Sequence, residues 1–314
     1  MRKIRWGKDW DVSEICFGAL PFGPLQKNLS PSQGGELIRR ALEKGINFID
    51  TAQAYRTYPH IREGLEGWGE KVYIATKSAA ETYDDMKEAV KEALSELNRD
   101  HIDVFHLHAA RVKPDVFTQR EGALTCLKEY QSRGVIGKVG IATHSASVVE
   151  EAGKREDIEV IFPLINKAGL GILDGDREDM ERAINRAFER GKNLYAMKVF
   201  AGGNLLNKGE EALEYVKSIK GLDVIAIGMV HEKELQANMK LFRGEDATEL
   251  LKETYKEEKQ LIILGFCNAC GNCLKHCPNQ ALYIEEEKCK VYREKCILCG
   301  YCAPHCPQFA IRLV

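Results

Sequence analysis

The stretch VYIATKSAAETYDDMKEAVKEALSELNRDHIDVFHLH, residues 72–108, decides the fold class of this chain. Two short apolar runs of strand length, Val72–Thr76 and Val104–His108, stand at its two ends. Between them, apolar side chains recur at helical spacing, and Thr82 precedes them in the manner of a helix N-cap. The stretch therefore predicts a strand, a helix and a second strand in succession.

The same alternation of strands and helices continues on both sides of this stretch. Six further strand candidates are Ile15–Ala19, Phe48–Asp50, Val139–Ala142, Val160–Ile165, Leu194–Lys198 and Val224–Gly228. Eight strands alternating with helices in about 240 residues fit a (β/α)8 barrel. A doubly wound sheet also alternates, but no G-x-G-x-x-G sequence follows the first strand candidate. The sequence therefore predicts an α/β fold in which residues 1–243 form a TIM barrel.

A repeated cysteine pattern marks the C-terminal part of the chain. Two runs of the form C-x2-C-x2-C-x3-C, each followed by proline, begin at Cys267 and at Cys296. This is the spacing of bacterial ferredoxins, in which the fourth cysteine of each run binds the cluster of the other run. Two [4Fe–4S] clusters are therefore predicted, one bound by Cys267, Cys270, Cys273 and Cys306, and one bound by Cys296, Cys299, Cys302 and Cys277.

Zinc or disulfides are the alternatives to iron–sulfur clusters. Four thiolates also suit a zinc ion, and dense cysteines suit disulfides in a secreted chain. Two runs of the same spacing favour the clusters. Cys289, Cys16 and Cys126 lie outside both runs and are predicted to be small packing residues. Residues 244–260 are charged and predict a connector helix, so that residues 261–314 form a small α+β ferredoxin-like domain.

The bulk composition argues against several kinds of partner. Hydrophobic residues make up 44% of the chain and charged residues 29%, as in ordinary soluble globular proteins. A formal net charge of −2 gives no electrostatic reason to expect a nucleic acid or an anionic membrane as a partner. No apolar segment of a secretory signal follows the basic N-terminus, and the apolar runs are too short to cross a bilayer. We therefore expect a cytoplasmic protein.

Four polar residues lie at or just beyond the ends of successive strand candidates. Asp50 ends the second candidate, and Tyr55 follows it by five residues. Lys77 follows the third candidate, and His108 ends the fourth. The active site of a (β/α)8 barrel lies at the C-terminal ends of its strands. Each residue alone has an ordinary structural explanation, such as a helix cap or a buried histidine, but the four together predict a catalytic site.

These residues belong to a set of motifs that resembles the aldo-keto reductase family over about residues 1–243. The motifs are Val12-Ser13…Phe17-Gly18, Phe48-Ile49-Asp50-Thr51-Ala52 with Tyr55, Thr76-Lys77, Ile102-Asp103-Val104 leading to His108, Ala196-Met197-Lys198…Ala201-Gly202-Gly203, and Ile227-Gly228-Met229…Glu234…Asn238. With the double-cluster domain appended, the chain resembles the branch of that family with a ferredoxin-like tail.

The resemblance implies a role for each of the four polar residues. Reduction of a carbonyl by a nicotinamide hydride leaves an alkoxide that needs a proton. Tyr55 is implied as the acid, with Lys77 lowering the pKa of its phenol and Asp50 fixing the Lys77 ammonium. His108 is implied to orient the substrate oxygen or to relay the proton. A metal site on His106 and His108 is disfavoured because no third ligand is evident.

The resemblance also implies a binding site for NADPH or NADH. The residues assigned to it are Thr143, His144, Asn166, Met197, Lys198, Gly203, Gly228 and Asn238. Several depart from the family pattern. Thr143 or His144 stands in place of the usual Ser-Asn pair, and Met197 replaces a tyrosine that often stacks on the nicotinamide. Glu234 stands where a basic residue for the 2′-phosphate is expected, so NADH remains an alternative to NADPH.

Two functions from different classes follow from these features. The first is an oxidoreductase that reduces a small carbonyl compound, or oxidises an alcohol, with a nicotinamide cofactor. The alternative is an iron–sulfur electron-transfer or docking protein whose barrel is a scaffold without nicotinamide-dependent catalysis. A hydride carries two electrons whereas a [4Fe–4S] cluster usually exchanges one, so a redox protein is a further partner to consider.

Overall fold

A computed structural model describes residues 1–7, 10–24, 26–110, 112–203, 205–254, 260–277, 280–293, 296 and 302–313. Within these residues, eight parallel strands form one sheet in the order β10-β3-β4-β5-β6-β7-β8-β9. Their bounds are β3 (Ile15–Gly18), β4 (Phe48–Asp50), β5 (Tyr73–Ser78), β6 (Ile102–Ala109), β7 (Ile136–Thr143), β8 (Val160–Pro163), β9 (Asn193–Leu194) and β10 (Ile225–Gly228).

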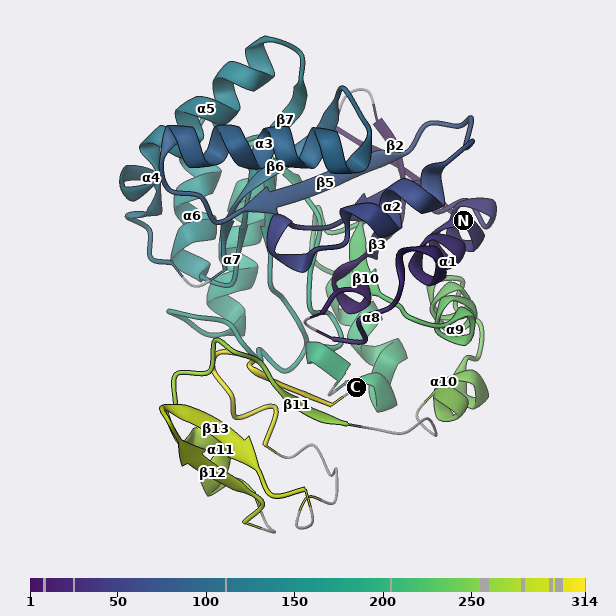
Figure 1. Ribbon diagram of the computed structural model, residues 1–314, viewed down its shortest axis with the longest axis vertical. Helices are drawn as coiled ribbons and strands as arrows, with labels where there is room; N and C mark the ends of the chain where they lie inside the picture. Colours follow the sequence, from purple (N-terminus) through teal and green to yellow (C-terminus); the bar gives the residue numbers. More distant parts are fainter. Residues whose placement is uncertain are drawn as a thin grey trace.

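The sheet closes into a barrel. Just after β9, the Ala196 nitrogen donates to the oxygen of Val224, and the Ala226 nitrogen donates to the oxygen of Ala196. These bonds join the last strand of the sheet to β10, which itself pairs with β3. The predicted (β/α)8 barrel is therefore confirmed (Figure 1).

Helices cover the outside of the barrel. They are α1 (Pro31–Glu43), α2 (Tyr58–Leu65), α3 (Tyr83–Leu97), α4 (Val116–Gln119), α5 (Glu121–Ser132), α6 (Ala146–Lys154), α7 (Arg177–Glu189), α8 (Gly209–Lys217) and α9 (Glu232–Phe242). The sequence sets their starts through local bonds: the Thr82 hydroxyl accepts from the Asp85 nitrogen at the start of α3. Ser30 and Gln33 form a capping box at the start of α1.

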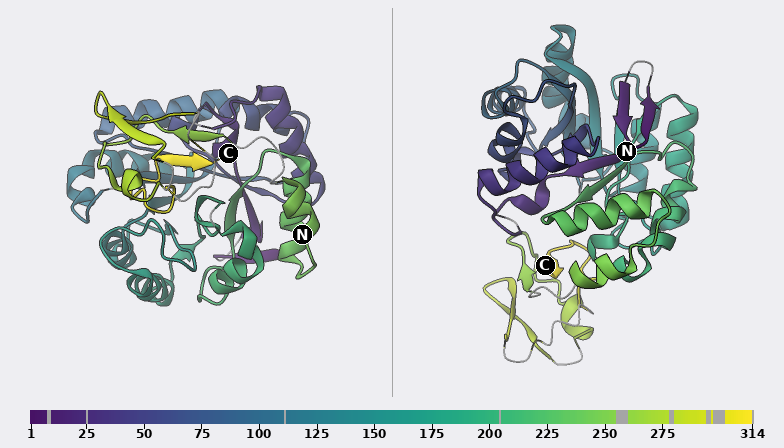
Figure 2. Two further views of the ribbon diagram at one scale, coloured as in Figure 1. Left: turned by 90° about the horizontal axis from the view of Figure 1, so that it is seen from below. Right: turned by 90° about the vertical axis from the view of Figure 1, so that its right-hand side faces the viewer.

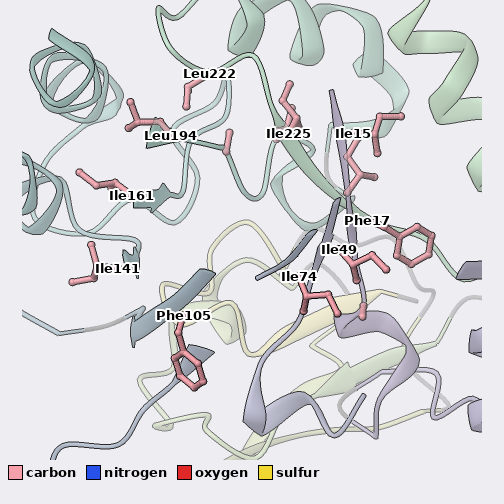
Figure 3. Packing of buried hydrophobic residues seen from close by; sticks show 14 of the residues in the cluster. Ile15, Phe17, Ile49, Ile74, Phe105, Ile141, Ile161, Leu194, Leu222 and Ile225 are labelled. Carbon is pink, nitrogen blue, oxygen red and sulfur yellow. The ribbon is translucent and has the colours of Figure 1, made fainter. Parts of the chain in front are cut away.

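Alternation along each strand divides the apolar side chains between two layers. Ile15 and Phe17 of β3 belong to the large core between strands and helices, together with Ile74 and Phe105. Figure 3 shows these residues and their counterparts from other strands around the ring. Cys16 lies between Ile15 and Phe17 in sequence and belongs to a separate core inside the barrel.

An N-terminal hairpin packs onto this inner core. It consists of β1 (Lys3–Trp6) and β2 (Trp10–Ser13), which pair antiparallel. The Trp6 ring lies 5.5 Å from that of Phe48 and 5.8 Å from that of Tyr195, centroid to centroid. Its indole Nε1 donates to the oxygen of Leu194 over 2.9 Å. The hairpin therefore adds Trp6 to the packing inside the barrel.

The chain then forms a small C-terminal unit. Helix α10 (Thr248–Thr254) lies within the predicted connector, and two antiparallel strand pairs follow. One pair is β11 (Leu261–Ile263) with β14 (Ile311–Leu313), and the other is β12 (Leu282–Glu285) with β13 (Lys288–Val291). The short helix α11 (Asn272–Lys275) accompanies the second pair. A view from below in Figure 2 shows this unit across part of one end of the barrel.

Candidate active site

Asp50 and Lys77 form a buried ion pair at one end of the barrel. Asp50 is the last residue of β4, and Lys77 lies inside β5 rather than after it. The Lys77 ammonium donates to Asp50 Oδ1 over 2.6 Å and to the oxygen of Thr51 over 2.7 Å. The Lys77 side chain is only 1% exposed, so the pair is shielded from solvent. The predicted partnership of these two residues is thus a direct contact.

Burial and pairing act in opposite directions on this ion pair. Burial raises the pKa of Asp50, while the Lys77 ammonium and the Tyr195 hydroxyl oppose that rise. For Lys77, burial alone lowers the pKa, but Asp50 and Tyr55 outweigh it and hold the pKa above its usual value. Lys77 therefore keeps its charge at neutral pH, which places a fixed ammonium beneath Tyr55.

Tyr55 and His108 complete the group that the sequence predicts. Tyr55 ends the 3-10 helix η2 (Gln53–Tyr55), directly after β4, and His108 lies near the end of β6. The Lys77 ammonium is 5.0 Å from the centroid of the Tyr55 ring. The rings of Tyr55 and His108 meet edge to face with centroids 6.0 Å apart. Asp50, Tyr55, Lys77 and His108 therefore gather at one place.

Burial and the nearby positive charges act in opposite directions on the pKa of Tyr55. Burial raises the pKa of this phenol, and the charges of Lys77 and Arg312 lower it only in part. Lys77 lowers this pKa, as the resemblance implies, but burial outweighs it, so the pKa of Tyr55 is raised overall. The physical reason is that the loss of hydration destabilises the phenolate by more than the nearby ammonium stabilises it. Tyr55 therefore holds its proton at neutral pH.

A hydrogen-bonded chain below this group was not predicted. The Tyr195 hydroxyl donates to Asp50 Oδ2 over 3.1 Å, and His106 Nε2 lies 2.7 Å from the same hydroxyl. Because Tyr195 gives its proton to Asp50, His106 Nε2 must be the donor in the second bond. Burial and the charge of Lys77 lower the pKa of His106 well below its usual value, which keeps the ring neutral.

The sequence contained a signal for both of these residues. His106 and His108 alternate on one strand and so face the same side, and Tyr195 alternates with Met197. The inward face of the barrel therefore includes His106 and Tyr195 as well as the predicted residues. His106 is bonded to Tyr195 rather than turned toward a shared metal site with His108.

The residues predicted to hold the nicotinamide amide make contacts within the chain. The Thr143 hydroxyl, at the end of β7, accepts from the Ser145 nitrogen over 3.1 Å. The Asn166 carboxamide is bonded at both ends to the backbone of Leu170. His144 is 8% exposed and meets the ring of Phe309 with centroids 6.1 Å apart. Asn166 therefore shapes its own loop.

The other predicted cofactor residues lie at the same end of the barrel. Met197 pairs with Leu164 in an isolated bridge, and Lys198 has a positive φ of 63°. Gly203 belongs to η3 (Ala201–Gly203), and Gly228 ends β10. Asn238 lies on α9, where its Nδ2 donates to the oxygen of Glu234 over 2.8 Å. These positions are compatible with an extended ligand across the strand ends.

Asn238 and Glu234 lie where the sequence predicts the adenosine end of the cofactor. Asn238 is 5% exposed, and its Oδ1 has no hydrogen-bond partner among the described residues. A buried acceptor of this kind fits a ligand N–H donor. One Glu234 carboxylate oxygen accepts from the Val230 nitrogen over 2.6 Å at the start of α9. A carboxylate at a helix N-terminus opposes a second anion there.

The cysteines of the C-terminal unit form a small core of their own. Cys267, Cys273, Cys302 and Cys306 are each 9% exposed or less, and Cys277 and Cys296 pack against them. Cys270 is exposed, and Cys299 lies outside the described residues. Cys289 packs with its sulfur 3.6 Å from that of Cys273.

Backbone groups surround several of these sulfurs with donors. The Ala281 nitrogen points to the sulfur of Cys277 over 3.2 Å, and the Ala310 nitrogen to that of Cys306 over 3.2 Å. The nitrogen of Cys289 lies 3.4 Å from the sulfur of Cys267. Such N–H groups stabilise thiolate ligands of iron–sulfur clusters. The donor set therefore fits the predicted clusters.

Two separate stretches of the chain match known protein families. Residues 14–221 match the aldo/keto reductase family, and residues 266–311 match the 4Fe-4S dicluster domain. The chain belongs to the aldo/keto reductase family and carries a C-terminal 4Fe-4S dicluster domain. The dicluster domain implies two clusters.

Individual relatives are distant. The oxidoreductase YqkF of Bacillus subtilis is 29% identical over 179 residues, covering 52% of this chain and 55% of YqkF. Methylglyoxal reductase DkgA of Escherichia coli is 25% identical over 171 residues, covering 52% and 61%. L-galactose dehydrogenase of Arabidopsis thaliana is 22% identical over 291 residues, covering 80% and 91%. The chain spans between half and two thirds of the length of the first two.

A solved structure shares the fold. An aldo-keto reductase of Bacillus halodurans has a TM-score of 0.64 at 22% identity, covering 81% of this chain and 96% of its own. In the described part of the chain, none of the helices combines the length and the apolar character needed to cross a lipid bilayer.

Proposed function

We propose that the barrel reduces the carbonyl group of a small molecule, or oxidises the corresponding alcohol, with Tyr55 as the proton donor. The observation that carries this proposal is the buried Lys77–Asp50 pair, 2.6 Å long, beneath a tyrosine that keeps its proton. A protonated phenol beside a fixed ammonium suits the moment at which a carbonyl oxygen gains negative charge.

Each residue of the group has a defined part in this proposal. Tyr55 holds the proton at its hydroxyl and donates it to the substrate oxygen. Lys77 stabilises the phenolate that remains, and Asp50 holds Lys77 in place over 2.6 Å. His108, edge-on to Tyr55, orients the substrate oxygen. Tyr195 holds the second oxygen of Asp50 by a hydrogen bond, and the neutral His106 in turn holds the Tyr195 hydroxyl.

A nicotinamide cofactor, when bound, supplies the hydride for this reaction. Its adenosine end fits the buried Oδ1 of Asn238, and Gly228 lies at the end of the neighbouring strand. At the nicotinamide end, the Thr143 hydroxyl accepts a hydrogen bond from Ser145 and can still donate one to the ligand. The Asn166 side chain is bonded to Leu170. The Glu234 carboxylate favours a nucleotide without a 2′-phosphate, so we propose NADH before NADPH.

A titration tests the cofactor and the acid together. The anaerobically purified protein is titrated with NADH and NADPH, and oxidation of the bound nucleotide is then followed with a panel of aldehydes and ketones. Tyr55→Phe is expected to retain nucleotide binding and to lower turnover by about 100-fold or more. Failure of the wild type to bind either nucleotide contradicts the proposal, and full turnover by Tyr55→Phe contradicts the assigned acid.

A second candidate function is an electron-transfer or docking protein whose barrel is a scaffold. Two observations favour it: Asn166 is occupied by Leu170, and His144 is covered by Phe309 of the C-terminal unit. In that case neither nucleotide binds, while the clusters still exchange electrons with a small redox protein. Cluster reduction by dithionite followed by oxidation with a ferredoxin-type acceptor measures that activity directly.

A further inference from the structure

The last strand of the C-terminal unit brings an arginine to the end of the barrel that holds Tyr55. In β14, Arg312 stands opposite Ile262 of β11. Its side chain is long and charged, yet the residue is only 8% exposed. The guanidinium Nη1 comes within 3.8 Å of the position that a Cβ on Gly202 would take. Arg312 is therefore buried against the loop that follows β9.

Phe309 holds this arginine in position. Its ring lies edge-on to His144, just beyond β7, and fills the space beside Gly171 in the loop after β8. A Cβ on Gly171 would stand 1.5 Å from a ring carbon of Phe309, so the fit depends on the glycine. The guanidinium carbon of Arg312 lies 5.8 Å from the centroid of the Phe309 ring. This cation–π contact limits the directions that Arg312 can take.

Arg312 acts electrostatically on the proposed acid. Its positive charge lowers the pKa of Tyr55, so the guanidinium is within electrostatic reach of the phenol. Lys77 is already bonded to Asp50 and to the oxygen of Thr51 on the inner side. The contacts with Gly202 and Phe309 thus place a second cation, from the C-terminal unit, at the end of the barrel where Tyr55 lies.

We propose that Arg312 binds the carboxylate of the substrate, and that the substrate is a 2-oxo acid or the corresponding 2-hydroxy acid. A guanidinium offers paired N–H groups that match a carboxylate, and in a 2-oxo acid the carboxylate is bonded to the carbonyl carbon. In this proposal the carbonyl oxygen lies at Tyr55 and the carboxylate at Arg312. This proposal rests on the proposed function for the chemistry that follows binding.

The reaction balances without participation of the carboxylate. The carbonyl carbon of the 2-oxo acid gains a hydride from the reduced nicotinamide, which is oxidised. The carbonyl oxygen gains the proton of Tyr55, which gives the 2-hydroxy acid, and the phenolate recovers a proton from solvent. Arg312 keeps its charge throughout and serves to bind and orient.

Matched pairs of substrates test the assignment. Pyruvate and phenylglyoxylate are compared with their primary amides, which have nearly the same shape but no charge. Arg312→Gln is expected to lower kcat/KM for both acids by about 10- to 100-fold, the range for losing a charge-assisted hydrogen bond, and to change it less than about 3-fold for the amides. Arg312→Lys restores part of the loss. Arg293→Gln, an exposed arginine of the same unit, is the control.

Binding measurements separate this proposal from the proposed function. Calorimetry records the binding of pyruvate and phenylglyoxylate with and without NADH, and iron content with the visible spectrum confirms that each variant keeps its clusters. If no carbonyl compound is turned over but acid binding is present and lost in Arg312→Gln, the proposed function fails and the carboxylate site stands. Equal losses for acids and amides, or no loss for the acids, overturn the carboxylate site.

Discussion

Burial decides how the ionisable residues at the barrel end behave. The same desolvation that raises the pKa of Tyr55 lowers that of His106, because in each case water stabilises the charged form. Lys77 escapes this trend because the charge of Asp50, together with Tyr55 and the hydrogen bond to Asp50, outweighs the effect of burial on its pKa. The residue types were evident in the sequence, but the balance between burial and pairing depends on three-dimensional neighbours. For that reason the direction of the Tyr55 shift could not be predicted.

The raised pKa of Tyr55 predicts a specific pH dependence. Reduction needs the protonated phenol, so its rate should stay level from neutral pH to about pH 10, the ordinary pKa of tyrosine, and fall only above it. Lys77 lowers this pKa, so Lys77→Met should move the fall to higher pH and slow alcohol oxidation, which needs the phenolate. Steady-state rates in both directions between pH 6 and pH 11 check this.

Lys71 supplies a matched control for this pH profile. It pairs with Asp103 over 2.7 Å, but its side chain is 54% exposed and is not part of the Tyr55 group. Lys71→Met should leave the pH of the fall unchanged. A fall that moves to lower pH in Lys77→Met would contradict the role given to Lys77.

The helices and strands followed from the sequence more closely than the site did. Strand β4 has the predicted bounds, and β6 and β7 extend beyond the predicted ranges. Strand β8 ends at Pro163, two residues before its predicted end at Ile165, although the Leu164 nitrogen still donates to the oxygen of Thr143. Periodicity detects such elements because one face of each is buried. It does not detect contacts between distant segments, such as Phe309 with His144.

The loop after β8 depends on Gly171 for two separate reasons. Its φ is +89°, and a Cβ would meet the Phe309 ring at 1.5 Å. Gly171→Ala should therefore displace Phe309 and lower the free energy of unfolding by more than the 1–2 kcal/mol, roughly, of a left-handed backbone alone. Thermal unfolding followed by circular dichroism measures the loss of stability.

Gly134→Ala isolates the backbone part of that effect. Gly134 has a φ of +75°, with nothing within 4 Å of the position of its Cβ. Its substitution should lower the melting temperature by only a few degrees, on the order of 2–4 °C per kcal/mol. If both variants lose the same stability, the Phe309 contact contributes nothing measurable to the fold.

Two units of different chemistry make up the whole molecule. The barrel buries its core between strands and helices, whereas the C-terminal unit gathers sulfur atoms in a much smaller core. A unit of this size requires additional stabilisation from metal ligation. The cysteine spacing made the second unit predictable from the sequence alone, since cluster geometry constrains the ligands locally.

The metal content of the purified protein tests the second unit. Protein prepared without oxygen should be brown and contain about eight iron atoms per chain, four for each cluster. Cys267→Ser should reduce the iron content to about four, whereas Cys289→Ser, outside the ligand sets, should leave it unchanged. Iron analysis with absorption spectroscopy measures both, and a colourless protein with bound zinc would refute the assignment.

Arg312 lies six residues after Cys306, so it is synthesised after the barrel and after the cysteines of the second unit. The ribosome finishes the barrel well before it releases the segment that covers one end of it. If the clusters organise the cysteines beside it, that segment reaches its place only after the metal has bound. If Arg312 recognises the substrate, insertion of the clusters becomes the last step in building the substrate site.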